Sequence, residues 1–308
     1  MDPASRTNTR RWPSELALPP VLEPYDSPHH PFAEYFFPAR RGRRERYAGW
    51  TGRPARPRRR AAITMVHNEP VFLPIWLRYY SRFFQAEDIY VLDNDTTDGS
   101  TGGDGFVRIP VSHRRVDHTW MVRTIEQLQH ELMQRYDVVV VTDVDEIVAP
   151  VPEWGTLDEY LDRIDEESVN CLGYEILHMR DEPPLDLTRP ILDQRGHWFI
   201  NDAYDKAAIA TVPLTWRPGF HGRADGAFNP DPDLRLVHLH RVDYDLCRER
   251  HKLRRRRRWA REDLKLGWAG HNRITNGVEF ERWFYEDSCF DSIEIAPEPI
   301  PPSWRGLF

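Results

Sequence analysis

The sequence predicts an α/β protein with a mainly parallel central sheet, flanking helices and a less regular C-terminal half. Between residues 61 and 142, short apolar runs alternate with stretches of helical spacing, which is typical of strand–helix–strand units. The most apolar run, DVVVVT at 137–142, directly follows one such stretch. With 308 residues and 40% hydrophobic content, the chain can bury a sizeable core.

The charges divide the chain into three parts. Residues 1–60 are rich in Pro and carry 13 Arg against 6 acids, a net of +7, with little periodicity to bury a face. Residues 61–240 carry 15 basic and 31 acidic residues, a net of −16, and residues 241–261 carry 10 against 3, a net of +7. We expect an N-terminal extension over 1–60, a folded domain over 61–260 and a C-terminal extension over 261–308 packed on it.

The elements of the first half follow from local pattern. Residues 61–66 (AAITMV) are apolar and partly β-branched, as in a buried strand. Apolar residues at i, i+3, i+4 and i+7 from Leu73 predict a helix that begins near Pro70, with Asn68 as a candidate cap. Further strands are expected at 88–92, 106–111 and 137–142, and a helix at 119–136.

The second half is less regular. It predicts helices at 156–164 and 244–259, and strands at 170–178, around 198, at 207–212 and at 234–240.

The cysteines and the hydropathy of the chain indicate in which cellular compartment the protein is expected. Cys171, Cys247 and Cys289 lie far apart without CxxC spacing, so neither a disulfide framework nor a thiolate zinc site is expected. No apolar run has the length of a membrane-spanning helix, and the opening residues lack the apolar stretch of a secretory signal. We expect a soluble cytoplasmic protein, with peripheral attachment to a membrane left open.

Three carboxylates follow the most apolar strand. Asp143, Asp145 and Glu146 would repel one another at a buried strand end unless a cation lay between them. Mg²⁺ or Mn²⁺ binds few protein carboxylates and completes its shell with phosphate oxygens and water, so this DxD predicts a metal that holds a diphosphate. The competing interpretation is a solvated turn.

A second polar run, DNDTTDGS at 93–100, follows the strand expected at 88–92. Such residues are common in any loop. Its position matters more, because the carboxyl ends of parallel strands open onto one crevice, which the DxD shares.

These stretches together resemble glycosyltransferases of the GT-A fold, especially glycosyltransferase family 2 and family 92-like bacterial enzymes. TMVHNEPVFLPIWLRYY (64–80) is similar to the opening strand and helix of that family, IYVLDNDTTDGS to its nucleotide loop and VVVVTDVDEIV to its DxD strand. The resemblance covers about residues 61–260. It implies a metal-dependent, inverting transfer from a nucleotide sugar, with UDP as the expected nucleotide and an unknown acceptor.

Residue by residue, the resemblance implies the following roles. The main chain at Val66, with Asn68 and Glu69, would lie along the base and ribose. Asp93 and Asn94 would contact the base, although Asn94 stands where the family usually has a second acid. Arg123 would approach the donor diphosphate, with Thr124 in place of the usual Asn. Asp143 would touch ribose or metal, and Asp145 would bind the metal.

Family members often supply a late histidine as a further metal ligand, and VHLH at 237–240 offers two. Alternation along a strand puts His238 and His240 on one face. A neutral imidazole beside carboxylates suits Mn²⁺. Both histidines remain candidates, and His240 is slightly favoured because it lies nearer the following turn. Structural histidines are the alternative.

Inverting transfer needs a general base for the acceptor hydroxyl. The leading candidates are Asp225, in the loop FHGRADGAF with His221, and Asp202, in NDAYDKAA with Lys206. Asp205 and Glu175 belong to the same pool, and the sequence does not choose among them.

The run Arg254–Arg258 lies on an expected helix, where five consecutive charges cannot all face one ligand. It could bind an anionic partner such as a diphosphate or a lipid phosphate, and no nucleic-acid module accompanies it.

Two other functions stay open. One is a haloacid-dehalogenase-type Mg²⁺ phosphohydrolase, although its DxD strand would open the fold; the other is an Arg-rich binding protein on a non-catalytic scaffold.

Overall fold

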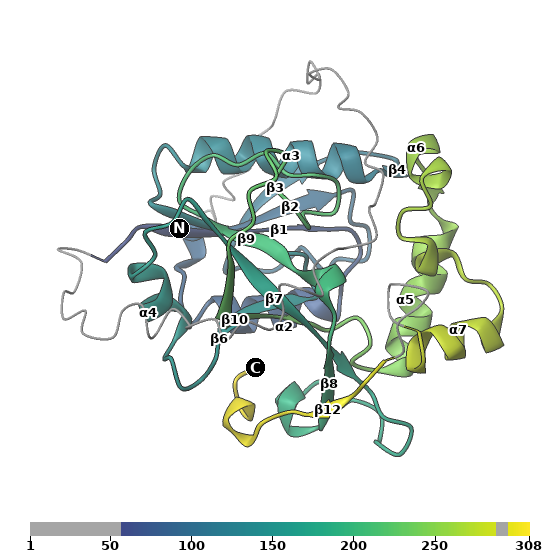
Figure 1. The fold of residues 1–308 in the computed structure, drawn as a ribbon. Coiled ribbons are helices and arrows are strands. Elements are labelled where there is room, and N and C mark those ends of the chain that lie inside the picture. The colour runs from purple at the N-terminus through teal and green to yellow at the C-terminus, as the bar shows by residue number, and fades with distance from the viewer. Residues whose placement is uncertain (1–56, 288–294) are drawn as a thin grey trace, which may run out of the picture.

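The computed structural model describes residues 57–287 and 295–308, so most of the predicted N-terminal extension lies outside the described residues. The predicted α/β class is confirmed (Figure 1). A ten-stranded sheet runs in the order β12-β8-β7-β9-β5-β1-β2-β3, with β10 beside β7 and β6 beside β10, and β4 and β11 form a small second sheet. The strands are β1 Arg60–Val66, β2 Ile89–Asn94, β3 Val107–Val111, β4 Arg115–Val116, β5 Val138–Val141, β6 Glu146–Pro150, β7 Ser168–Leu177, β8 His197–Ile200, β9 Lys206–Ala210, β10 Pro230–His238, β11 Arg258–Trp259 and β12 Glu298–Pro299.

The N-terminal half of the sheet is parallel. β3, β2, β1 and β5 are neighbours that all run in the same direction, and Val66 pairs with Asp93 in the register of β1 and β2. The carboxyl ends of these strands therefore share one edge. This edge is where the predicted site loops begin.

The C-terminal half of the sheet is mostly antiparallel. β9 runs antiparallel to β5 and β7, and β8 runs antiparallel to β7. β10 pairs parallel with β7 and antiparallel with β6. β6, whose five residues begin at Glu146 directly after the DxD turn, was not predicted from the sequence. Because Glu146 of β6 pairs with His238 of β10, the DxD turn lies beside the C-terminal end of β10.

Two helices cover the two faces of the parallel strands, α2 (Phe72–Tyr80) on one and α3 (His118–Leu132) on the other (Figure 1). Trp76 is fully buried in the core under α2 and donates its Nε1–H to Thr142 Oγ1 at 2.8 Å, which links α2 to the end of β5. The expected cap is not formed: the N-cap of α2 is Val71, without a side-chain hydrogen bond.

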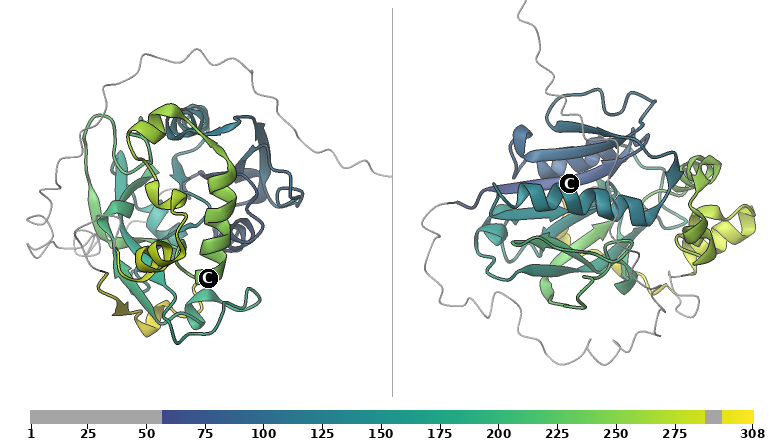
Figure 2. Two further views of the ribbon diagram at one scale, coloured as in Figure 1. Left: turned by 90° about the vertical axis from the view of Figure 1, so that its right-hand side faces the viewer. Right: turned by 90° about the horizontal axis from the view of Figure 1, so that it is seen from above.

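The remaining helices are α4 (Leu157–Asp162), α5 (Tyr244–Arg256), α6 (Arg261–Lys265) and α7 (Gly277–Tyr285). In Figures 1 and 2, α5, α6 and α7 stand together at one end of the sheet. α5 ends earlier than predicted, because Arg258 and Trp259 pair with β4. Phe280, Trp283 and Phe284 of α7 pack in a small core with Cys247 of α5.

The last residues return to the main core, where Ile300, Trp304 and Phe308 are buried. The boundaries at residues 60 and 260 stay predictions. Within residues 57–287 and 295–308, no helix combines the length and apolar character needed to cross a membrane.

Candidate active site

A cavity of about 1340 Å³ opens at the shared carboxyl edge of β1, β2 and β5. Loops after these strands, the end of β10, the segment 202–206 and one side of α5 form its walls. Of the residues singled out from the sequence, those that line it are Val66, Asn68, Glu69, Asn94, Asp143, Asp145, Glu146, Asp202, Asp205, Lys206, His221, His238, His240, Arg254, Arg256 and Arg257. Asp93, Arg123 and Asp225 are not among the described lining residues.

The loop after β1 is fastened to the loop after β2. Asn68 has a left-handed backbone (φ 54°), and its Oδ1 accepts the Thr97 N–H at 2.7 Å. His67 Nδ1 lies 2.7 Å from the carbonyl oxygen of Asn94. Asn68 therefore joins two loops of the cavity instead of capping α2.

Asp93 faces away from the cavity into its own loop. Its carboxylate accepts hydrogen bonds from Thr96 N–H, Thr101 Oγ1 and Arg108 Nε at 2.9, 2.8 and 2.6 Å. Burial opposes ionisation, but these hydrogen bonds outweigh it and lower the pKa of Asp93. The side chain shapes the loop, and the neighbouring Asn94 is the residue that reaches the cavity.

Lys206 lies between two carboxylates of the DxDE segment. Its Nζ is 2.6 Å from Asp143 Oδ2 and 2.6 Å from Glu146 Oε1, and its side chain is 3% exposed. Burial alone would lower the pKa of Lys206, but the two negative charges raise it. Burial raises the pKa of Glu146 to about 7 against the opposing charge of Lys206. The side chain of Asp143 remains 40% exposed toward the cavity.

Arg250 makes the corresponding bridge for the other carboxylates. Its guanidinium contacts Asp145 and donates to Glu69 Oε1 at 2.7 Å. Although burial opposes ionisation of Asp145, the charge of Arg250 and the nearby His238 lower its pKa well below its usual value. Glu69 and Asp145 therefore share Arg250 as a partner, and the expected place of Glu69 along the base and ribose stays a prediction.

His238 is held by a buried carboxylate. Glu175 Oε2 lies 2.8 Å from His238 Nδ1, and His238 Nε2 points to Asp145 Oδ2 at 3.6 Å. Burial lowers the pKa of His238, but Glu175 and Asp145 outweigh it and raise the pKa to about 10. A carboxylate behind an imidazole is the usual arrangement of a metal-binding histidine.

The donor set at this point fits a divalent metal. Ligand atoms of Asp145, His238 and His240 lie within 4.8 Å of one another, and all three residues are buried. Oxygen and imidazole ligands together suit Mn²⁺. A metal here would take the place of the proton on His238 and share Asp145 with Arg250. Burial and neighbouring histidines lower the pKa of His240 well below its usual value, which leaves its imidazole neutral.

The candidate bases differ in their surroundings. Asp205 lines the cavity, is 8% exposed and accepts the Gly173 N–H at 2.7 Å. Burial raises its pKa to about 7. The turn that carries it lies tightly on β7, because a Cβ at Gly173 would be 2.4 Å from the Asn201 carbonyl oxygen. Asp202 lines the cavity from the same turn, whereas Asp225 is 54% exposed and bonded to Arg223.

Arg123 lies on α3, and its side chain does not line the cavity. His118 and Met121 of α3 reach the cavity, and Arg123 lies two residues further along, which turns its side chain by about 200° from that of Met121. Its position therefore gives no support to a role at the donor.

Arg250 was not among the site residues predicted from the sequence. Arg250 and Arg254 are four residues apart on α5, the spacing of one helix face, and both line the cavity. Arg257, directly after the last residue of the helix, lines it as well. Burial lowers the pKa of Arg254 and Arg257, so part of this positive charge is incompletely compensated. The four-residue spacing between Arg250 and Arg254 could have indicated a shared helix face, but the run Arg254–Arg258 obscured it.

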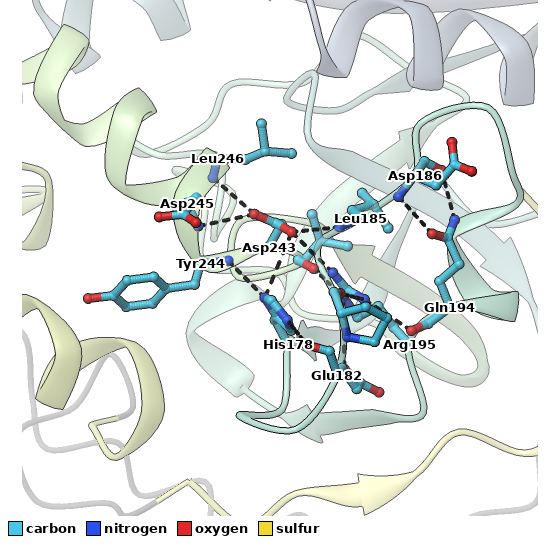
Figure 3. A network of polar contacts seen from close by, with 12 residues as sticks. His178, Glu182, Leu185, Asp186, Gln194, Arg195, Asp243, Tyr244, Asp245 and Leu246 are labelled. Atoms are coloured by element: carbon cyan, nitrogen blue, oxygen red, sulfur yellow. Dashed lines mark hydrogen bonds and ion pairs between the residues drawn. The ribbon is translucent and has the colours of Figure 1, made fainter.

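A buried network fixes the start of α5 (Figure 3). Asp243 Oδ1 accepts the backbone N–H groups of Asp245 and Leu246 at 3.0 and 3.1 Å, which caps the helix. Asp243 Oδ2 accepts from Leu185 N–H at 2.8 Å and from Arg195 at 3.2 Å. These bonds fix the rotation of α5 that turns Arg250 toward Asp145.

Comparison with known proteins adds little to this geometry. No protein-family model matches the chain, and no curated protein matches its sequence. Among solved structures, it is similar to a mannosyltransferase, PcManGT from Pyrobaculum calidifontis, in complex with GDP-Man and Mn²⁺, at 14% identity over 78% of this chain and 75% of that chain, with a TM-score of 0.35. A likeness at this level does not bear on what this chain binds.

Proposed function

We propose that the protein is a glycosyltransferase that takes a sugar from a nucleoside-diphosphate sugar with the help of a divalent metal ion. One observation carries the proposal. The loops that hold Asn68, Asn94 and Asp143 come from three strands and meet at one cavity, beside the imidazole of His238. Parallel sheets bind ligands at this edge, and a carboxylate–imidazole group there suits a metal-bound diphosphate.

The donor would lie across the edge of the parallel strands. Val66, Asn68, Glu69 and Asn94 provide the wall for base and ribose, and the resemblance of 64–80 and 89–100 to family 2 supports UDP as the nucleotide. Arg254, whose guanidinium lies 3.6 Å from Glu69, and Arg257 add positive charge to the cavity lining, where a diphosphate would be neutralised.

Asp145 and His238 would hold the metal, with Asp143 as the next ligand. Mn²⁺ or Mg²⁺ bound there would stabilise negative charge on the departing diphosphate. Glu175 orients His238, and Lys206 holds Asp143 and Glu146 in fixed positions.

Asp205 is the best-placed general base. A base works best with a pKa near the working pH, and burial brings the pKa of Asp205 to about 7. Asp202 stays the second candidate because it lines the same wall. Asp225 is exposed and paired with Arg223, which disfavours it. A carboxylate base that deprotonates the acceptor agrees with an inverting reaction.

Thermal unfolding with nucleotides tests the proposal. UDP and GDP are added separately, each with and without Mn²⁺. For a nucleotide at 100-fold excess over its Kd we expect a rise of about 5 °C that depends on Mn²⁺. Turnover of a generic phosphomonoester without any nucleotide response would favour the phosphohydrolase, and no response to either would favour a binding protein.

Asp145→Asn distinguishes the metal-dependent part of nucleotide binding from the rest. The carboxylate lies between Arg250 and His238, and we expect its loss to abolish the Mn²⁺-dependent part of UDP binding in calorimetric titrations. Asp225→Asn is the matched control and should bind like the wild type, because Asp225 does not line the cavity. An undiminished Mn²⁺ effect in Asp145→Asn would contradict the ligand assignment.

A further inference from the structure

Behind the DxD site, one cysteine and two histidines come together at the junction of β10 and α5. Ligand atoms of His240, Cys247 and His251 lie within 4.8 Å of one another. The three residues are 3%, 1% and 3% exposed, so the cluster is closed to solvent. The Asp145–His238–His240 group shares His240 with it, but Cys247 and His251 do not line the cavity.

The spacing of these residues is that of a metal-binding motif. Cys247 and His251 are four residues apart on α5 and so lie on one face of the helix. His240 approaches from the end of β10, across the turn that Asp243 caps. Two ligands from a helix and one from a neighbouring strand end surround a common point.

The polar atoms of the cluster are only partly satisfied. His240 Nε2 lies 2.7 Å from His251 Nε2, a contact that one hydrogen bond accounts for. His251 Nδ1 is buried and has no hydrogen-bond partner among the described residues. Buried polar atoms without partners are rare, and each calls for an explanation such as an ion.

We propose that His240, Cys247 and His251 supply three of the ligands of a structural binding site for Zn²⁺, separate from the metal of the DxD. Thiolate and imidazole are the ligands zinc prefers, whereas the carboxylates at Asp143 and Asp145 suit Mn²⁺ or Mg²⁺. Ligand atoms around tetrahedral zinc lie about 3.3–3.6 Å apart, so closure from the present spacing needs shifts of about 1 Å or less. The Cys247 thiol loses its proton to solvent as the zinc–sulfur bond forms.

This site has a consequence for the cavity. Arg250 lies between Cys247 and His251 in sequence, and it contacts Asp145 and Glu69. Zinc would tie α5 to the end of β10 and so hold Arg250 in place. The absence of CxxC spacing, which argued against a thiolate site in the sequence, does not exclude this one because its ligands come from two elements.

The test uses the full chain purified from zinc-supplemented medium, with metal content measured by inductively coupled plasma mass spectrometry after desalting. We expect about one zinc per chain in the wild type and more than about 100-fold weaker zinc binding in Cys247→Ser, because loss of even an outer partner of a metal ligand costs about 10–100-fold. Cys171→Ser is the matched control, since Cys171 is also buried and free, and it should keep its zinc. Asp145→Asn should keep it as well.

Cobalt substitution covers the case in which Cys247→Ser does not fold. In the wild type, Co²⁺ at this site gives a thiolate-to-cobalt charge-transfer band in the near ultraviolet, and added Zn²⁺ removes it. The absence of this band, or of bound zinc, overturns the proposal. So does a result in which Asp145→Asn loses the zinc and Cys247→Ser keeps it, since the metal would then lie at the carboxylates.

Discussion

Lys206 is the residue on which the charge balance of the DxDE segment depends. Without it, Glu146 stays buried beside Asp143 with no cation between them. We expect Lys206→Met to lower the free energy of unfolding by about 2–4 kcal/mol. Removing one partner of a fully buried ion pair would cost more, but here Asp143 is partly exposed and can turn to solvent. Urea denaturation measures the change. Lys252→Met, which removes an exposed partner of Glu249, should change it by less than about 0.5 kcal/mol. Equal effects of the two substitutions would contradict the role of Lys206.

Asp205 should make the free energy of unfolding fall as the pH rises. Burial raises its pKa from 3.8 to about 7, so the folded state favours the protonated carboxyl. Its stabilising contribution is therefore complete below about pH 4 and is lost as the pH rises through about 7. Asparagine keeps the acceptor for the Gly173 N–H and carries no charge. We expect the stability of Asp205→Asn relative to wild type to increase by about 2–3 kcal/mol between about pH 5 and pH 8.

Urea denaturation at the two pH values measures this difference, and Asp225→Asn is the control. Arg223 lowers the pKa of Asp225, so its contribution is present throughout that range and is lost only in more acidic solution. The difference between Asp225→Asn and wild type should therefore stay constant from about pH 5 to pH 8. A constant difference for Asp205→Asn would mean that its carboxyl is ionised in the folded protein at both pH values.

At the scale of elements, the start of α5 determines where the arginines of the cavity point. Asp243 caps the helix and also faces Arg195, whose side chain is fully buried. We expect Asp243→Ala to cost about 3–5 kcal/mol, because it removes a cap worth about 1 kcal/mol and leaves a buried guanidinium with less compensation. Asp243→Asn should lose less, since it keeps the capping oxygen.

Chemical denaturation followed by circular dichroism measures both Asp243 variants. Asp245→Ala is the matched control: it lies on the same first turn, but its side chain is 69% exposed, and we expect a change within about 0.5 kcal/mol. A loss from Asp243→Ala no larger than that of the control would mean that the network in Figure 3 does not fix the helix.

The elements with strong local patterns could be predicted from the sequence. β1, α2, β2 and α3 have a period or an apolar run that their own residues specify, and their predicted ends were within a few residues. β6 could not be predicted, because five residues after a turn acquire strand structure only by pairing with β10. The end of α5 was misplaced for the same reason, since β11 forms only where β4 is available.

At the site, the sequence could indicate which strand ends meet but not how their charges pair. Three parallel strands place Asn68, Asn94 and Asp143 at one edge by topology alone. The partners Arg250 and Lys206 come from elements 60 or more residues later in the chain, and only the fold brings them to the carboxylates. The burial of Asp205 likewise depends on the contact between Gly173 and the turn before Asp205, which only the fold supplies.

Over the whole molecule, the C-terminal residues pack into the same core as the sheet, so we expect them to unfold together with it. Trp304 is 3% exposed and packs edge-on against Trp198 of β8, with ring centroids 5.0 Å apart. We expect Trp304→Ala to lower the free energy of unfolding by about 3–5 kcal/mol, in a single transition that fluorescence and circular dichroism report at the same urea concentration. Val278→Ala, at a side chain that is 78% exposed, should change stability by less than about 0.5 kcal/mol. If Trp304→Ala instead produced an early transition that left the sheet folded, residues 295–308 would be an appendage, and the C-terminal boundary would mark a separable part of the protein.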